Sequence, residues 1–205
     1  MVKQILFTAV WLAAAGCASA GDLLKDLSAW QLRAAPAAAL ASAISVQPDG
    51  VVAVAGTPSG FLATTASYRN YRLHVEWRWP GKAGNAGVLL HISEGAMDRV
   101  WPLSIQVQTK AGSVGDLLPM AGASFSEALT GDKPALKART GASAERPAGE
   151  WNSADIVARD GVIEVSVNGV LQNRVTGAAP SEGRIGFQLE GTPYELRGVT
   201  LAPLD

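Results

Sequence analysis

The sequence predicts an all-β fold, one antiparallel sandwich with one long loop. Three observations point to it. Several short stretches alternate apolar and polar side chains, as half-buried strands do. The pairs Asp160-Gly161 and Asn168-Gly169 favour the two-residue turns that join antiparallel strands. No long amphipathic helix and no internal repeat competes with these signals.

The expected elements follow the chain in order. Residues 21–43 mix helix-favouring Leu and Ala with Trp30, and they hold either a short helix or a first strand. Single strands are then expected at residues 51–56, 71–79, 86–92, 103–110, 183–191 and 193–204, and three joined strands at residues 151–175. One irregular segment remains at residues 114–149. A loop of that length is uncommon in a compact domain and is often functional.

Length and composition limit the function classes. The chain has 205 residues and a formal net charge of −1, which suits one well-cored domain. No basic patch or run appears, so nothing indicates a nucleic-acid partner. Charged residues make up only 17% of the chain, as is common in all-β and exported proteins.

The first 20 residues are predicted to be a secretory signal peptide, because Lys3 precedes an apolar run and a small-residue end. The run is too short for a transmembrane span. Cleavage after Ala20 would release the chain, whereas lipoprotein processing of residues 1–16 would leave a lipid anchor on Cys17; the weak lipoprotein box favours free export. Cys17 is the only cysteine. We therefore expect one disulfide-free domain, residues 21–205, in the periplasm or envelope.

Alternation also assigns the faces of the strands, because residues i and i+2 share a face. In residues 71–79, His74, Glu76 and Arg78 lie opposite the apolar side chains. Two further strands present amides on their polar faces, at Gln106, Gln108 and Gln188. Amides offer paired donors and acceptors that suit sugar hydroxyls. We therefore expect one polar floor, which either binds a carbohydrate or is ordinary solvated surface.

Four segments, in order, resemble the 3-keto-disaccharide hydrolase-like family. They are YRLHVEWRWPGKAGNAGVLLHI, VWPLSIQVQTKAGSVGDLL, RPAGEWNSADIVARDGVIEVSVNGVLQNR and GRIGFQLEGTPYELRGVTLAPL. The likeness runs from about residue 68 to residue 204. It implies a concanavalin-like jelly-roll sandwich and a hydrolase or lyase that acts on oxidised, 3-keto glycosides.

A ketone at C3 changes how a glycoside can be cleaved. The ketone acidifies the proton on C2, a base removes that proton, and the C1 substituent departs by elimination before water adds. The protein must supply a base, an acid or a metal, and hydrogen bonds to the hydroxyls. An ordinary glycosidase instead uses two carboxylates.

The resemblance and the residue types together assign candidate roles. The catalytic candidates are Glu76, His74 and Asp116. The substrate-binding candidates are Arg78, Asn85, Gln106, Gln108, Trp101, Glu150, Gln188 and Arg197. No cofactor is certain, but a divalent metal would be held if His74, Glu76 and His91 converged.

Departures from the family pattern keep other functions open. Gln106 stands where the family has a glutamate, His91 where an arginine is common and Gly198 where an asparagine is usual. An amide can bind a hydroxyl but cannot act as a base, so a non-catalytic carbohydrate-binding module remains an alternative, as does a structural envelope domain. Asp116 and Glu150 flank the long loop and are expected to overhang the polar face; a turn residue and a surface ion pair are their alternatives.

Overall fold

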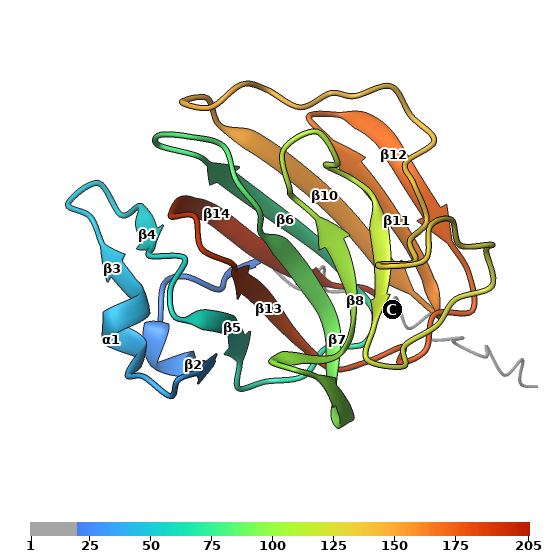
Figure 1. Ribbon diagram of the computed structural model, residues 1–205, viewed down its shortest axis with the longest axis horizontal. Coiled ribbons are helices and arrows are strands. Elements are labelled where there is room, and N and C mark those ends of the chain that lie inside the picture. The colour runs from blue at the N-terminus through green and yellow to red at the C-terminus, as the bar shows by residue number, and fades with distance from the viewer. Residues whose placement is uncertain (1–19) are drawn as a thin grey trace, which may run out of the picture.

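Two antiparallel sheets pack into a sandwich in the computed structural model, as Figure 1 shows. The structure describes residues 20–205, so the predicted signal peptide and Cys17 lie outside the described residues. The all-β prediction is confirmed. Within residues 20–205, no helix is long and apolar enough to cross a membrane.

Each sheet has a simple order. Sheet A runs β12 (Val170–Val175), β11 (Val162–Val167), β10 (Asn152–Arg159), β6 (Tyr71–Arg78), β14 (Tyr194–Pro203), β4 (Val52–Val54) and β3 (Ile44–Val46), with β1 (Gly21–Asp22) on β14. Sheet B runs β2 (Trp30–Ala35), β5 (Ser59–Thr64), β13 (Arg184–Leu189), β7 (Gly87–Asp98), β8 (Trp101–Gln108) and β9 (Leu117–Met120). Two short helices, η1 (Leu27–Ala29) and α1 (Leu40–Ala43), accompany the first strands.

The core lies between the sheets and consists of the apolar faces that alternation predicts. Val75 and Trp77 of β6 meet Val107 of β8 and Phe187 of β13 in one buried cluster. Each such side chain contributes roughly 1.5–3 kcal/mol when it is fully buried. Because the apolar faces meet inside, the polar faces of the two sheets point outward in opposite directions.

This arrangement corrects the expectation of a single polar floor. Glu76 belongs to sheet A, whereas Gln106 and Gln188 belong to sheet B. Alternation identifies which residues of one strand share a side, but it carries no information about which sheet the strand joins. The predicted site residues are therefore divided between two separate surfaces.

The predicted hairpins of residues 151–175 are confirmed. β10, β11 and β12 follow one another as antiparallel neighbours. Both residues of each turn have positive φ, at 49° and 76° for Asp160 and Gly161, and at 48° and 81° for Asn168 and Gly169. This is the geometry of the type I′ turns that Asp-Gly and Asn-Gly favour.

Three strands, β3, β5 and β9, lie outside the ranges in which strands were expected. β5 lacks alternation because both of its faces are buried, with Leu62 in the main core and Phe61 and Ala63 in a second apolar cluster. β9 lies within residues 114–149, which were expected to be irregular. Residues 21–43 contain both elements that were considered, a strand and a short helix.

The long segment between β9 and β10 closes one side of the sandwich. We call residues 121–149 the strap. Its Lys137 pairs with Leu117 of β9 at 3.0 Å, and its Thr140 donates to Gln172 of β12 at 2.8 Å. The strap therefore covers the free edges of both sheets, which would otherwise be open to other strands. The structure does not place Asp116 or Glu150, the two residues expected to overhang the polar face, above that face: Asp116 accepts from the strap, and Glu150 is exposed in the turn before β10.

Candidate functional site

The candidate site is built on the outer face of sheet B, where β13, β7 and β8 lie side by side (Figure 1). The register places Leu89 between Gly186 and Gln106, and it places Gly87 opposite Gln108. Gln188 follows Gly186 by two residues and so shares its face. We call the three glutamines 106, 108 and 188 the amide floor.

Gly87 allows the amides to converge. A Cβ atom at position 87 would lie 2.7 Å from Nε2 of Gln106 and 2.8 Å from Oε1 of Gln188. Real Cβ contacts are not that short, so any larger residue would push the two amides apart. Side chains from two flanking strands thus meet above the central strand because the residue between them has no side chain.

Hydrogen bonds fix part of this floor and leave part of it free. Oε1 of Gln108 accepts from Nε2 of Gln106 and from the backbone N–H of Lys110, both at 3.1 Å. Among residues 20–205, Oε1 of Gln188 and Oδ1 of Asn85 are buried without a hydrogen-bond partner. A buried acceptor without a partner is costly. A hydroxyl donor placed above the floor would remove that cost.

A hairpin extension borders the floor. We call residues 93–103 of β7 and β8 the arm. Ser93 pairs with Leu103 and Met97 with Pro102, so three residues bulge out and bend the hairpin. At its tip, Arg99 is near enough to influence Glu190, beyond the opposite end of β13. The tip of the arm therefore brings a positive charge within range of Glu190.

Charged side chains lie next to the amide floor, where the chain continues past the ends of β8 and β13 and before the start of β7. Thr109 donates to Ala86 at 3.1 Å and Ala111 to Gly84 at 3.0 Å, so Lys110 lies beside Asn85. On the other side of the same segment, Gly84 packs against Thr192: an added Cβ there would lie 2.2 Å from Oγ1 of Thr192.

That packing brings the segment after β13 alongside Asn85. Glu190 shares the face of Gln188, two residues before it. Lys110, Asn85 and Glu190 therefore form a row across three chain segments. We call it the end row.

Glu190 is the carboxyl group of this candidate site, and it was not among the residues predicted from the sequence. Burial raises the pKa of Glu190, while the positive charges of Arg99 and Lys110 oppose the rise. A carboxylate with a raised pKa accepts protons better at neutral pH. The available signal was its spacing, since position 190 continues the i, i+2 series from Gln188.

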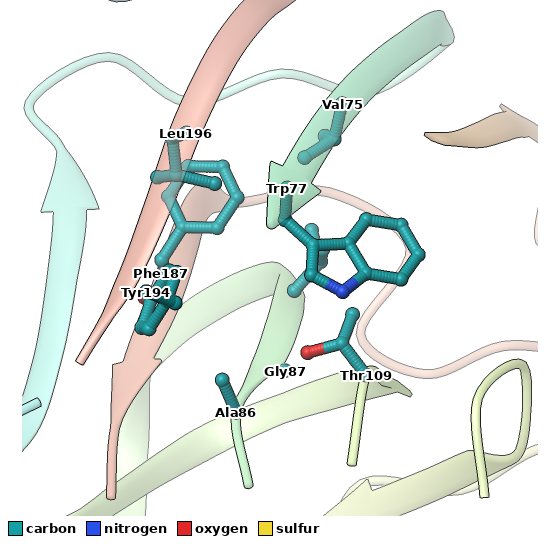
Figure 2. Close-up of a pocket in the computed structure, with 9 residues that line it drawn as sticks. Val75, Trp77, Ala86, Gly87, Thr109, Phe187, Tyr194 and Leu196 are labelled. Carbon is teal, nitrogen blue, oxygen red and sulfur yellow. The ribbon is translucent and has the colours of Figure 1, made fainter. Parts of the chain in front are cut away.

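A small core cavity lies behind the floor and does not form part of the site. It has a volume of about 10 Å³, and Gly87, Trp77 and Thr109 are among its lining residues. Figure 2 shows the indole of Trp77 beside Thr109. The space suffices for one water molecule at most. It cannot hold a sugar.

The opposite surface, on sheet A, holds the first-choice residues Glu76 and His74. Nε of Arg197 lies 2.7 Å from Oε2 of Glu76. Nε2 of His74 lies 3.5 Å from the other oxygen of Glu76, and Nδ1 of His74 lies 2.8 Å from Asp155. The carboxylate that was predicted to be catalytic is therefore engaged by its own neighbours.

The rest of the sheet A surface is also internally paired. Arg78 contacts Glu195 through two nitrogens, at 2.7 Å and 2.6 Å. The guanidinium groups of Arg78 and Arg197 both lie over the ring of Trp151, at 4.6 Å and 4.1 Å from its centroid. We call these residues, with Glu76, His74 and Asp155, the sheet A network. It consists of satisfied contacts and offers little to a ligand.

Three further candidates have other surroundings. Asp116 is buried, and its carboxylate accepts from the backbone N–H of Arg139 in the strap at 2.8 Å. Glu150 is exposed in the turn before β10. Neither overhangs the floor. Trp101 is 6% exposed at the base of β8 and belongs to neither apolar cluster.

The three residues considered for a metal do not converge. His91 is buried in sheet B, where its Nδ1 lies 3.0 Å from the carbonyl oxygen of Pro180 and its ring meets Tyr71 edge-on. His74 and Glu76 face outward from the other sheet. Within residues 20–205 no group of three or more His, Cys, Asp or Glu side chains could hold a metal ion.

A surface hollow of about 360 Å³ lies beside β10, β11 and β12. Its charged lining residues pair loosely with one another, Arg159 with Asp160 at 3.9 Å and Arg174 with Glu164 at 4.0 Å. None of its lining residues is an amide. The amide floor and the end row are therefore the stronger site.

Comparison with solved structures supports the fold. A candidate glycosyl hydrolase from Parabacteroides distasonis superposes with a TM-score of 0.65 at 21% identity, over 88% of this chain and 90% of that chain. A second from the same organism gives 0.66 at 16% identity, over 91% and 100%. The carbohydrate-binding module CBM66 of Bacillus subtilis gives 0.57 at 11%, over 85% and 95%. At these identities the likeness shows the jelly-roll fold alone.

Comparison of sequences identifies the family. No curated protein matches the chain. A profile of the 3-keto-alpha-glucoside-1,2-lyase-like domain matches residues 22–202. That match confirms the resemblance found in the sequence and the expectation of a carbohydrate-related jelly-roll protein. The chain therefore belongs to the 3-keto-alpha-glucoside-1,2-lyase-like domain family.

Proposed function

We propose that this protein cleaves 3-keto-glycosides on the outer face of sheet B, with Glu190 as the base. The observation that carries the proposal is the adjacency of the amide floor to the end row. The floor offers acceptors and donors for sugar hydroxyls, including the unpaired Oε1 of Gln188. The end row adds one carboxyl whose pKa burial raises.

The chemistry follows from the ketone. The carboxylate of Glu190 takes the proton from C2, and the electrons of that C–H bond form the C2=C3 bond of an enediolate with its charge on the C3 oxygen. When the C3 carbonyl re-forms, the double bond moves to C1=C2 and the C1 substituent departs with the bonding electrons. It takes up the proton that Glu190 removed from C2, directly or through water, which returns Glu190 to the carboxylate. Water then adds across this double bond, which gives net hydrolysis. Only one carboxylate is required, unlike in an ordinary glycosidase.

The direct test follows release of the C1 substituent from 3-keto-trehalose or a 3-keto-glucoside, with and without EDTA. We expect Glu190→Gln to lower kcat by about 100-fold or more, because general-base catalysis contributes about 10²–10⁴-fold. The substitution keeps the shape of the side chain and removes its basicity. In the wild-type protein the rate should rise with pH through a pKa above the ordinary glutamate value. Full activity in Glu190→Gln would place the base elsewhere.

A non-catalytic carbohydrate-binding module is the second candidate, and Gln106 favours it. At this position the family pattern has a glutamate, and an amide cannot remove a proton. The same incubation separates the two functions. Measurable sugar binding without release, with and without EDTA, would support the binding module and end the enzyme proposal.

Export completes the proposal and rests on the signal pattern of residues 1–20. The mass of the mature N-terminus tests it. A chain that begins at Gly21 indicates free export, and a lipidated Cys17 indicates a membrane anchor. Retention of Met1 in the native host would contradict both routes.

A further inference from the structure

The end row places a cation and a carboxyl on either side of Asn85. Thr109 and Ala111 pair with Ala86 and Gly84, so the backbone of Lys110 runs one strand spacing from Asn85. The register of β13 and β7 pairs Phe187 with Val88, and its extension by three residues places Glu190 one spacing away on the other side. Neighbouring strands are about 4.8 Å apart, so the two backbones are separated by about 10 Å. That gap suits one sugar ring lying over Asn85.

Lys110 is anchored at the backbone and free at its charged end. Its N–H donates to Oε1 of Gln108 at 3.1 Å, which ties its position to the amide floor. The side chain is exposed. In the described chain its ammonium group forms no ion pair. It is therefore available to an anion that forms above Asn85.

Arg99 differs from Lys110 in each of these respects. It occupies the tip of the arm, its side chain is 80% exposed, and it lies 3.7 Å from Asp98. No contact ties it to the amide floor. Both cations influence Glu190 from a distance, but only Lys110 is positioned beside a sugar that occupies the end row.

We infer that Lys110 is a catalytic residue that neutralises the C3 oxygen of the enediolate. This inference rests on the proposed function. Removal of the C2 proton moves an electron pair onto the C3 oxygen, which becomes negatively charged. A positive group on the side of the ring opposite the base would stabilise that charge. Charge that develops in the transition state is stabilised best by a group already in place. The Lys110 ammonium supplies that group and is unchanged when the carbonyl re-forms.

The test compares Lys110→Met with the matched variant Arg99→Met on a methyl 3-keto-glucoside. Two readouts are followed across pH: exchange of the C2 proton for deuterium by NMR, and release of methanol. Lys110→Met should lower the pH-independent plateau of both rates by about 100-fold, the usual cost of one lost oxyanion partner. Lys110→Arg should restore part of it, because the positive charge is kept.

Arg99→Met should keep its plateau within about twofold, on the scale of an exposed charge. The acidic limb of its pH–rate profile should move to higher pH, because loss of a nearby cation raises the pKa of Glu190. If Lys110→Met also moves only the acidic limb of the pH–rate profile, Lys110 affects nothing but the pKa of Glu190. That result would overturn the inference. If the wild-type protein produces neither exchange nor release, the proposed function itself fails, and that result is distinguishable from the first.

Discussion

At the scale of single residues, His91 is a buried titratable side chain whose surroundings oppose its charge. It is 1% exposed, and its Nε2 is buried without a partner in the described chain. Burial lowers its pKa to about 4, although the carbonyl of Pro180 and the charge of Glu182 act the other way. The folded protein therefore holds this histidine neutral at pH values where the unfolded chain protonates it.

The stability of the protein should consequently fall in mild acid. The unfolded pKa of histidine is about 6.5, so the contribution of His91 is fully present above pH 6.5 and is lost as pH falls toward 4. The integrated loss by pH 4 is about 3 kcal/mol. Urea unfolding between pH 7 and pH 4 measures it.

The control for this prediction is His91→Asn, since asparagine tolerates the positive φ of 56° at this position. The variant should be less stable at pH 7 but should lose less stability on acidification. Parallel stability curves for the two proteins would show that other groups cause the pH dependence.

The residue scale is also where sequence reasoning about the site was weakest. Gln106, Gln108 and Gln188 were identified by alternation, and the register joins them. Glu190 was not selected because the features that favour it in our proposal are its burial and two cations from distant segments, which no local pattern reveals. Glu76 was preferred because it stands in a family motif, yet a motif position does not disclose that Arg197 already occupies the carboxylate.

At the scale of elements, the strap bonds to the edge strands of both sheets and so closes one side of the sandwich. Asn173 of β12 donates to Lys137 of the strap at 3.0 Å and to Gly115 at 3.2 Å. Gly141 passes so close to β12 that an added Cβ would lie 2.2 Å from the carbonyl oxygen of Leu171. The strap is thus part of the sandwich rather than a lid over a ligand.

Gly141→Ala should therefore destabilise the protein by about 1–3 kcal/mol, the usual cost of overpacking against backbone that cannot move freely. Gly81→Ala is the matched control, because a Cβ at position 81 meets nothing within 4 Å. The control should stay within about 0.5 kcal/mol of the wild type. Thermal or urea unfolding measures both. Equal stabilities would mean that the strap yields locally and does not hold the edges.

Elements were predicted well where the sequence alternates and poorly where it does not. β6, β8 and β13 each bury one face, so polar and apolar residues report their orientation. β5 buries both faces, so its side chains do not alternate between apolar and polar with a period of two residues. β9 is four residues long, and its strand character arises from pairing with β8 rather than from its own residues. Tertiary context decides such elements.

At the scale of the whole molecule, the sandwich separates a self-paired charged surface on sheet A from the outer face of sheet B, where we propose the binding site. The sheet A network is charged, self-paired and outward-facing. The amide floor is uncharged and buried, and within residues 20–205 it is incompletely paired. Surface ion pairs contribute little to stability, typically about 0–1 kcal/mol, whereas unpaired buried amides cost stability that a ligand can restore. The two surfaces therefore suit different functions.

One comparison tests this division directly. Glu76→Gln breaks the contact with Arg197 and should lower stability by about 0.2–1 kcal/mol, while kcat/KM for 3-keto-trehalose stays unchanged. Gln188→Ala removes a buried acceptor that has no partner, so stability should change little. Its kcat/KM should fall about tenfold, because one hydrogen bond of about 1.4 kcal/mol to the substrate corresponds to that factor. Unfolding curves and steady-state rates on the same two variants decide the matter. Loss of turnover in Glu76→Gln with normal turnover in Gln188→Ala would reverse the assignment of the two faces.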